Sequence, residues 1–124
     1  MNNRTTSYKD LIVWKKSYDL SILIYKLTKK FPKDEVYGLT SQIRRCAVSI
    51  PLNIAEGYSR YRKLEFAYFL QISFASGAEL ETQILISKDL DYISQGEFDE
   101  VNSLLIEVMK MLNSLMSKVR LSNK

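Results

Sequence analysis

A proline inside a helical pattern constrains this chain more than any other feature of its sequence. Pro51 lies in the segment 49–57, SIPLNIAEG, yet the apolar phase of a helix continues through it. Apolar residues recur there at steps of three and four, the period of one helix face: Leu39, Ile43, Cys46, Ala47, Ile50 and Ile54. A proline removes one backbone donor and crowds the carbonyl four residues back, here Ala47, at about 3 kcal/mol. We therefore expect a helix kinked at Pro51.

This helix should begin between Asp34 and Leu39 and stop at Gly57, because glycine gives easy access to positive φ. A polar row lies beside the apolar one: Gln42, Arg45, Ser49, Asn53 and Glu56. Two interpretations stay open for Arg45, a hydrogen-bond network within or between subunits and contact with a ligand. Its neighbour Arg44 points about 100° away on the helix. We expect Arg44 to be freer to meet solvent or a phosphate.

The preceding segment predicts a helix from about Asp10, a candidate N-cap, to about Lys30. Phe31 and Pro32 end it, since the residue before a proline is pushed out of the helical region. Two apolar rows follow its length: Leu11, Trp14, Tyr18, Ile22 and Tyr25, and Leu20, Ile24, Leu27 and Phe31. A helix so broadly apolar must be covered on more than one side, which favours association between subunits.

Two more helices follow. The first covers about 62–90 and carries a patch of small residues around Gly77, which indicates close approach of a neighbouring helix from the same or another subunit. The last opens with the capping box Ser94-x-x-Glu97 and ends near Leu121. Its apolar row alternates steps of three and four, as in the seam of a bundle: Phe98, Val101, Leu105, Val108, Leu112, Leu115 and Val119.

No segment alternates with the period of a strand, and the turns between helices are short enough to favour antiparallel neighbours. We therefore expect an all-α fold, an antiparallel up-down-up-down four-helix bundle. The 124 residues suit one domain, 1–124. Its ordered core should cover about 9–121, with disorder confined to roughly the first eight and last four residues.

Composition excludes several kinds of active site. The chain has no histidine, which excludes Ser-His and Cys-His nucleophile pairs and the carboxylate-histidine sites of di-iron bundles. Cys46, the only cysteine, lies on the apolar row, where we expect a small buried side chain. The carboxylates worth testing as a metal site are Glu79, Glu81, Glu97 and Glu100, but acids in the first turn of a helix are expected for capping. We expect no metal, no cofactor and no catalytic residue.

The sequence shows neither a membrane-spanning stretch nor a signal-peptide pattern. The longest aliphatic and aromatic stretch is 22–25, far shorter than the ~20 residues that span a membrane. The first seven residues lack the apolar core of a signal peptide. We therefore expect a cytoplasmic protein with no membrane partner.

Charge is divided unevenly between the two halves of the chain. The formal net charge is +4, but residues 1–63 hold 13 Lys/Arg against 5 Asp/Glu, whereas residues 64–124 hold 5 against 9. The halves therefore carry +8 and −4. Such a distribution suits either a polyanion on the basic side or contact between the basic and acidic halves of neighbouring subunits.

The segment 57–63, GYSRYRK, interleaves basic residues with two tyrosines and leads into a helix N-terminus. Free backbone donors at such an end favour an anion, and tyrosine rings can stack on unpaired bases. The alternative is a solvated loop whose charges pair with nearby acids, and the lysines of the first helix suit a solvated face. The candidate nucleic-acid-binding residues are Arg44, Arg45, Arg60, Arg62 and Lys63.

Several motifs together resemble a known family: 39–45 LTSQIRR, 49–57 SIPLNIAEG, 11–14 LIVW, 29–32 KKFP, 69–70 FL and 79–82 ELET. They are similar to those of the small bacterial four-helix-bundle proteins encoded in intervening sequences of large-subunit ribosomal RNA genes. Relatives of that family include the accessory variability protein of diversity-generating retroelements. The resemblance implies a homo-oligomer, a pentameric ring, that binds nucleic acid without known catalysis, with ribosomal RNA or a reverse transcriptase as partner.

From residues and resemblance together we predict a non-enzymatic, oligomeric nucleic-acid-binding scaffold or accessory protein, with RNA favoured over DNA. The alternative is a structural adaptor whose basic half binds an acidic protein partner.

Overall fold

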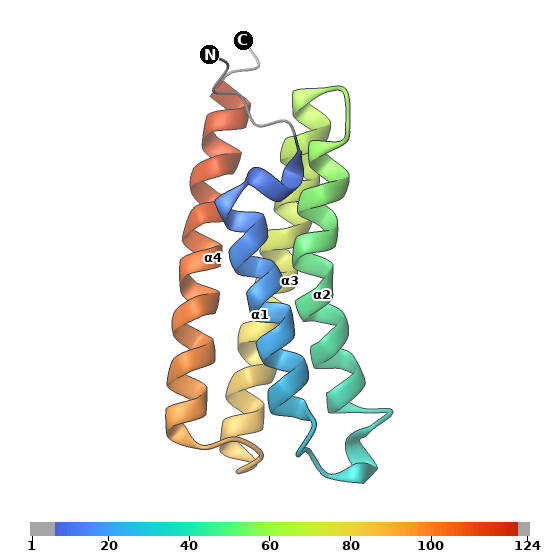
Figure 1. Cartoon of the computed structure of the whole chain (residues 1–124), viewed down its shortest axis with the longest axis vertical. Coiled ribbons are helices and arrows are strands. Elements are labelled where there is room, and N and C mark those ends of the chain that lie inside the picture. Colours follow the sequence, from blue (N-terminus) through green and yellow to red (C-terminus); the bar gives the residue numbers. More distant parts are fainter. Residues whose placement is uncertain (1–6, 122–124) are drawn as a thin grey trace.

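The computed structural model describes residues 7–121, which form four antiparallel helices in up-down-up-down order (Figure 1). They are α1 (Ile12–Thr28), α2 (Leu39–Tyr58), α3 (Lys63–Asp89) and α4 (Gln95–Leu121), with the short 3₁₀ turns η1 (Tyr8–Asp10) and η2 (Lys33–Glu35). Each helix packs against the next, and α4 returns to α1. The predicted all-α four-helix bundle is confirmed, and no strand occurs within the described range.

Disorder was expected at both termini. That expectation falls mainly on residues 1–6 and 122–124, which lie outside the described residues. For Tyr8 it was wrong, because this residue belongs to η1. None of the helices within 7–121 is long and apolar enough to cross a membrane.

The start of α1 differs from the prediction. Asp10 is not its N-cap but the last residue of η1, which is capped by the Ser7 hydroxyl accepting from the Lys9 amide at 3.1 Å. The extended residue Leu11 then precedes α1 and gives it no side-chain cap. The helix ends at Thr28, two residues earlier than expected.

The start of α2 is capped from outside the helix. The Leu39 amide donates to Oε1 of Glu35 at 3.0 Å, and the Tyr92 hydroxyl donates to Oε2 at 2.9 Å. These two hydrogen bonds, the Leu39 amide first, lower the pKa of Glu35 because they favour its charged form. The cap joins the α1–α2 loop to the α3–α4 turn.

The predicted capping box of α4 is confirmed. The Glu97 amide donates to the Ser94 hydroxyl at 3.1 Å, and the Ser94 amide donates to the Glu97 carboxylate at 2.8 Å. Glu97 also pairs with Lys30 from the end of α1. Hydrogen bonding to Lys30, followed by the Ser94 amide, lowers the pKa of Glu97.

One continuous core runs the length of the bundle. It is built from the predicted inner faces, and its fully buried members include Leu20, Ile24, Ile43, Ile50, Ile54, Leu70, Leu80, Ile84, Leu105 and Leu112. The row of α1 that contains Tyr18, Ile22 and Tyr25 behaves differently from the row that contains Leu20 and Ile24, which is buried in the core. Tyr18, Ile22 and Tyr25 remain between 41% and 48% exposed, so one side of α1 is left uncovered in the single chain.

Pro51 lies within α2, and its neighbours replace the hydrogen bond that it cannot make. The Ser21 hydroxyl of α1 donates to the carbonyl of Ala47 at 3.0 Å, sharing its proton with the Ser17 carbonyl at 3.1 Å. Ala47 is the residue whose carbonyl loses its helical partner when position 51 is proline. From the other side, the Ser73 hydroxyl of α3 donates to the carbonyl of Ile50 at 2.9 Å. Both flanking helices therefore bind the backbone of α2 around the proline.

The small-residue patch of α3 is occupied from within the chain. A Cβ added at Gly77 would overlap Sδ of Met109, which belongs to α4. The close approach predicted for this glycine is confirmed, and the neighbour is a helix of the same subunit.

Replacing Ser21 by alanine should lower the free energy of unfolding by about 1–2 kcal/mol, because the buried Ala47 carbonyl would lose its donor. Ser17→Ala is the matched control, since the Ser17 hydroxyl bonds back to the Trp14 carbonyl of its own helix and should cost less. In a Pro51→Ala background the amide returns, and the cost of Ser21→Ala should shrink. Urea unfolding of the four variants measures this coupling. An equal cost in both backgrounds would show that Ser21 does not substitute for the missing amide.

Candidate nucleic-acid interface

The turn between α2 and α3 is short and tightly packed. The Ser59 amide donates to the Ala55 carbonyl and the Arg60 amide to the Gly57 carbonyl, each at 3.1 Å. The role predicted for Gly57 was wrong: α2 continues to Tyr58, and none of the described glycines has positive φ. A Cβ at Gly57 would instead lie 2.7 Å from Cβ of Phe69. The glycine lets the end of α2 press against α3.

Three of the predicted cations gather on this turn, and all three are exposed. Arg60 pairs with Glu56 at 2.7 Å, and its guanidinium lies 4.9 Å from the centre of the Phe69 ring. Arg62 is the N-cap of α3 and forms no ion pair with any residue in 7–121. No side-chain hydrogen bond caps this helix N-terminus, which begins at Lys63 beside Arg62.

The two tyrosines of the turn have different surroundings. Tyr58 packs edge-on against Phe66, with ring centres 5.8 Å apart. Tyr61 is fully exposed, at 102% of its reference surface. Of the two tyrosines of this turn, Tyr61 therefore presents its ring to solvent, between Arg60 and Arg62. We name the exposed residues Arg60, Tyr61, Arg62 and Lys63 the α2–α3 patch.

The antiparallel topology brings further cations to this end of the bundle. Lys118 and Arg120 lie in the last turn of α4 and are exposed, and α4 ends at the same end as the α2–α3 turn (Figure 1). They were not among the predicted residues, because they belong to the acidic half of the chain. The predicted up-down-up-down order already places the end of the fourth helix beside the turn between the second and third, so it could have identified these two residues.

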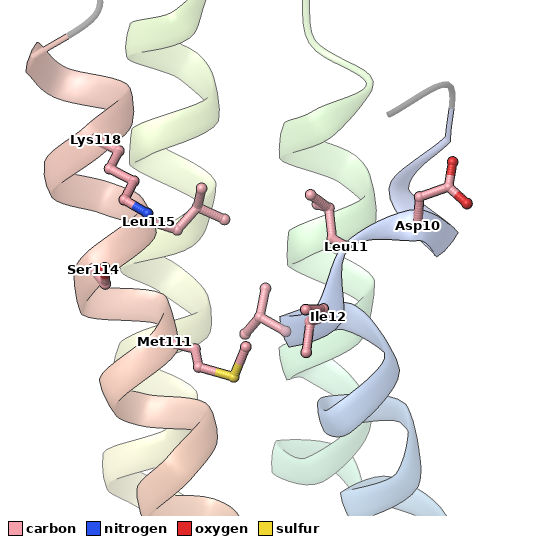
Figure 2. A pocket seen from close by; sticks show the side chains of 8 residues that line it. Asp10, Leu11, Ile12, Met111, Ser114, Leu115 and Lys118 are labelled. Carbon is pink, nitrogen blue, oxygen red and sulfur yellow. The ribbon is translucent and has the colours of Figure 1, made fainter. Parts of the chain in front are cut away.

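An apolar groove of about 360 Å³ adjoins this end between the start of α1 and the end of α4. Figure 2 shows Leu11, Met111 and Leu115 along it, with Lys118 on the α4 side and Asp10 on the η1 side. Its walls carry few polar groups, so the groove offers little to a phosphate beyond the Lys118 ammonium.

Arg44 and Arg45 lie far from the patch. Arg45 precedes Arg60 by fifteen residues, which is about 22 Å along a helix. Arg45 is exposed and donates to the Gln42 side chain at 3.2 Å. The five predicted residues therefore do not form a single surface.

The expectation that Arg44 would be the freer arginine was wrong. Its Nε donates to the Thr28 hydroxyl at 2.7 Å, and a terminal nitrogen donates to the Tyr25 carbonyl at 3.4 Å. The guanidinium also lies 4.6 Å from the centre of the Tyr25 ring. Arg44 thus binds the C-terminal end of α1, where a cation is favoured by the helix dipole.

The rest of the polar row on α2 forms hydrogen bonds within the subunit. The hydroxyls of Ser49 and Ser76 lie 2.8 Å apart, and the side-chain Nδ2 of Asn53 donates to the Ser49 carbonyl at 2.8 Å. The Ser49–Ser76 hydrogen bond joins α2 to α3 beside the Ser73 hydrogen bond, whereas the Asn53 hydrogen bond lies within α2. Ser49 and Asn53 are therefore structural residues, whereas Arg45 is exposed and bonds to Gln42.

Cys46 lies beside an acidic residue, with its Sγ 3.9 Å from a carboxylate oxygen of Glu79. Within 7–121, no three Asp, Glu or Cys side chains converge as metal ligands. Cys46 is only partly buried, less than expected. Its burial raises the pKa of the thiol, which keeps the group in its less reactive protonated form.

Gly57→Ala should destabilise the protein by about 1–3 kcal/mol, since the new methyl group meets the Cβ of Phe69 and the backbone of Phe66, which cannot move freely. Gly77→Ala is the matched control. There the methyl group meets the flexible Met109 side chain, and both variants gain the same helix propensity of about 1 kcal/mol. Urea unfolding followed by circular dichroism compares them. If Gly57→Ala were the milder change, close packing at the turn would not be the reason for this glycine.

Fold and site together define a class: antiparallel four-helix bundles with basic residues and an exposed aromatic ring at one end. The chain belongs to the 23S rRNA-intervening sequence protein family, whose model matches residues 9–114. The predicted family membership is confirmed, whereas the relation to diversity-generating retroelements stays a prediction.

A solved structure supports the same architecture. It is the crystal structure of a protein with unknown function from the S23 ribosomal protein family of Bacteroides thetaiotaomicron VPI-5482. The two chains share 24% identity over 85% of this chain and 98% of the other, with a TM-score of 0.79. At that identity the likeness concerns the fold. None of the curated proteins compared with the chain matches it.

Proposed function

We propose that the protein is a non-enzymatic, homo-oligomeric scaffold or accessory protein that binds RNA in preference to DNA through the α2–α3 patch. The observation that carries this proposal is the fully exposed Tyr61 ring between two exposed arginines, at a helix N-terminus that no side chain caps. Cations and the positive end of a helix dipole suit phosphates, and the ring suits a base. The absence of histidine from the sequence supports a role without catalysis.

The preference for RNA rests on two observations. Stacking on a single aromatic ring needs an unpaired base, and sequence-specific RNA recognition mostly uses loops, bulges and ends. The family is also named for a segment of 23S ribosomal RNA. A ribosomal RNA segment is therefore the first target to test, and a reverse transcriptase partner remains an expectation from the resemblance alone.

The proposed oligomer rests on the uncovered side of α1. Tyr18, Ile22 and Tyr25, with Leu52 of α2, line an apolar groove of about 320 Å³. Leu52 is 62% exposed. Contiguous apolar surface of this kind marks an interface in soluble proteins. A ring of five comes from the family resemblance, and it would repeat the α2–α3 patch once per subunit, so that weak binding at each patch adds through avidity.

The adaptor alternative has less support. Two lysines of the basic half pair with carboxylates of α4. Lys16 of α1 pairs with Glu107 at 3.0 Å, and Lys30, which follows the end of α1, pairs with Glu97. Part of the basic half is therefore neutralised inside the subunit. The cations of the α2–α3 patch are separate from these pairs.

Replacing Arg60, Arg62 and Lys63 together by alanine should weaken RNA binding and flatten its salt dependence. The log–log slope should fall by about 0.7 for each single-strand phosphate that the variant no longer neutralises. Tyr61→Leu should weaken binding to unpaired RNA more than Tyr61→Phe, which keeps the ring. Arg45→Ala is the control on the neighbouring helix and should leave the slope unchanged. Fluorescence anisotropy against salt measures all four variants. A wild-type protein that binds no polyanion at low salt would leave the adaptor as the better explanation.

Ile22→Glu should break the oligomer, because it places a charge on the apolar row of α1. Leu90→Glu is the control, since Leu90 is exposed to a similar degree, 50% against 41%, but lies at the end of α3. Light scattering should give a multiple of 14.4 kDa for the wild type and the control. A wild-type monomer at micromolar concentration would refute association, whereas a dimer or tetramer would refute only the ring of five.

A further inference from the structure

A hollow of about 470 Å³ lies between the end of α1, η2 and the start of α2. This α1–α2 loop cavity is at the opposite end of α2 from the α2–α3 patch (Figure 1). Three cationic side chains line it, Lys29, Lys33 and Arg44, together with Thr40. No carboxylate of the described residues is among its lining groups. Its electrostatic character is therefore that of an anion site.

Thr40 contributes a buried polar group that has no partner. The residue is 6% exposed, and its hydroxyl makes no hydrogen bond within the described part of the chain. Buried hydroxyls are nearly always paired. Thr28 on the same wall illustrates this, because its hydroxyl donates to the Ile24 carbonyl at 2.8 Å. An acceptor bound in the cavity would give Thr40 the partner that the protein does not supply.

Arg44 is positioned for a ligand while most of its donors remain unused. Its hydrogen bonds to Thr28 and Tyr25 engage two N–H groups. A guanidinium has five, so three are left for an oxyanion. Because the group is already held in place, little freedom is lost when it binds.

The backbone amide of Leu39, at the start of α2, is not available to a ligand in the cavity. The Leu39 amide is taken by Glu35, and both oxygens of that carboxylate accept hydrogen bonds from protein groups, Leu39 and Tyr92. The donors available to a ligand are therefore the side chains of Lys29, Lys33, Arg44 and Thr40.

We infer that the α1–α2 loop cavity binds the terminal phosphate of a nucleotide, free or at the 5′ end of an RNA chain. Three cations match the double charge of a phosphate monoester better than the single charge of a backbone diester. Apolar wall is supplied by Phe31, Pro32 and Val36, which suits the attached nucleoside. The volume falls in the range of small-molecule sites. This site is additional to the α2–α3 patch and does not depend on it.

Calorimetry on the full chain tests the inference with 5′-AMP, adenosine and inorganic phosphate. The expected result is that 5′-AMP binds, adenosine does not, and phosphate competes. Anisotropy with one RNA sequence bearing either a 5′-phosphate or a 5′-hydroxyl identifies the source. Tighter binding of the phosphorylated strand assigns the site to RNA ends, and binding of 5′-AMP without that difference assigns it to free nucleotides. If the phosphate makes no difference in either pair, the inference is wrong.

Three variants locate the effect. Lys33→Gln should weaken binding of the phosphate-bearing ligand by about threefold to tenfold, and Lys15→Gln, an exposed lysine of α1 outside the cavity, should not change it. Thr40→Val removes only the hydroxyl, so it should weaken the ligand while leaving the melting temperature unchanged or higher. A phosphate effect that persists in Lys33→Gln and Thr40→Val would place the site elsewhere and overturn the assignment.

The two proposed sites fail independently. Replacing Arg60, Arg62 and Lys63 should lower affinity for both RNA strands and leave the difference caused by the 5′-phosphate intact. Loss of RNA binding together with retained 5′-AMP binding would refute the proposed function alone. Retained RNA binding, with no phosphate effect either between the two RNA strands or between 5′-AMP and adenosine, would refute the cavity alone.

Discussion

A proline in the middle of α2 leaves the Ala47 carbonyl without its helical partner, and the Ser21 hydroxyl of α1 takes the place of the missing amide. Because Ser21 must face α2, the rotation of α1 about its axis is constrained. On an α-helix, Tyr18 and Tyr25 flank Ser21 three and four residues away. They therefore lie along the outer edge of the α1–α2 seam, where they remain exposed. One buried hydrogen bond thus helps to determine which apolar surface the single chain leaves uncovered.

The cations around the α2–α3 turn lie at two kinds of helix end, C-terminal and N-terminal. Lys118 and Arg120 lie in the last turn of α4 and Arg60 follows the end of α2, where cations offset the negative end of the helix dipole. Arg62 and Lys63 stand at the N-terminus of α3, where cations are unfavourable. Of the three cations that we propose for binding, the helix dipole therefore favours Arg60 and opposes Arg62 and Lys63.

Periodicity and capping chemistry predicted the four helices, most of their boundaries and the capping box of Ser94 and Glu97, because those signals are local. Tertiary packing decided the rest. The spacing of Gly77 predicted close approach but could not identify Met109 as the neighbour. Gly57 was predicted to end the helix through positive φ, but the structure shows that it is needed for close packing against Phe69. The pairing of Arg44 with Thr28 depends on how α1 meets α2, which no single helix encodes.

The two ends of α2 present different recognition chemistry. Its twenty residues separate the α2–α3 patch from the α1–α2 loop cavity by about 30 Å, a span of about nine base pairs in a duplex at 3.4 Å each. The patch offers an exposed ring and exposed cations, which tolerate many sequences. The cavity offers a fixed guanidinium and a buried hydroxyl, which require one terminal group. In a closed ring both would be repeated by symmetry, so the sequence-tolerant patches could supply affinity through avidity while the cavity discriminates a chain end from continuous RNA.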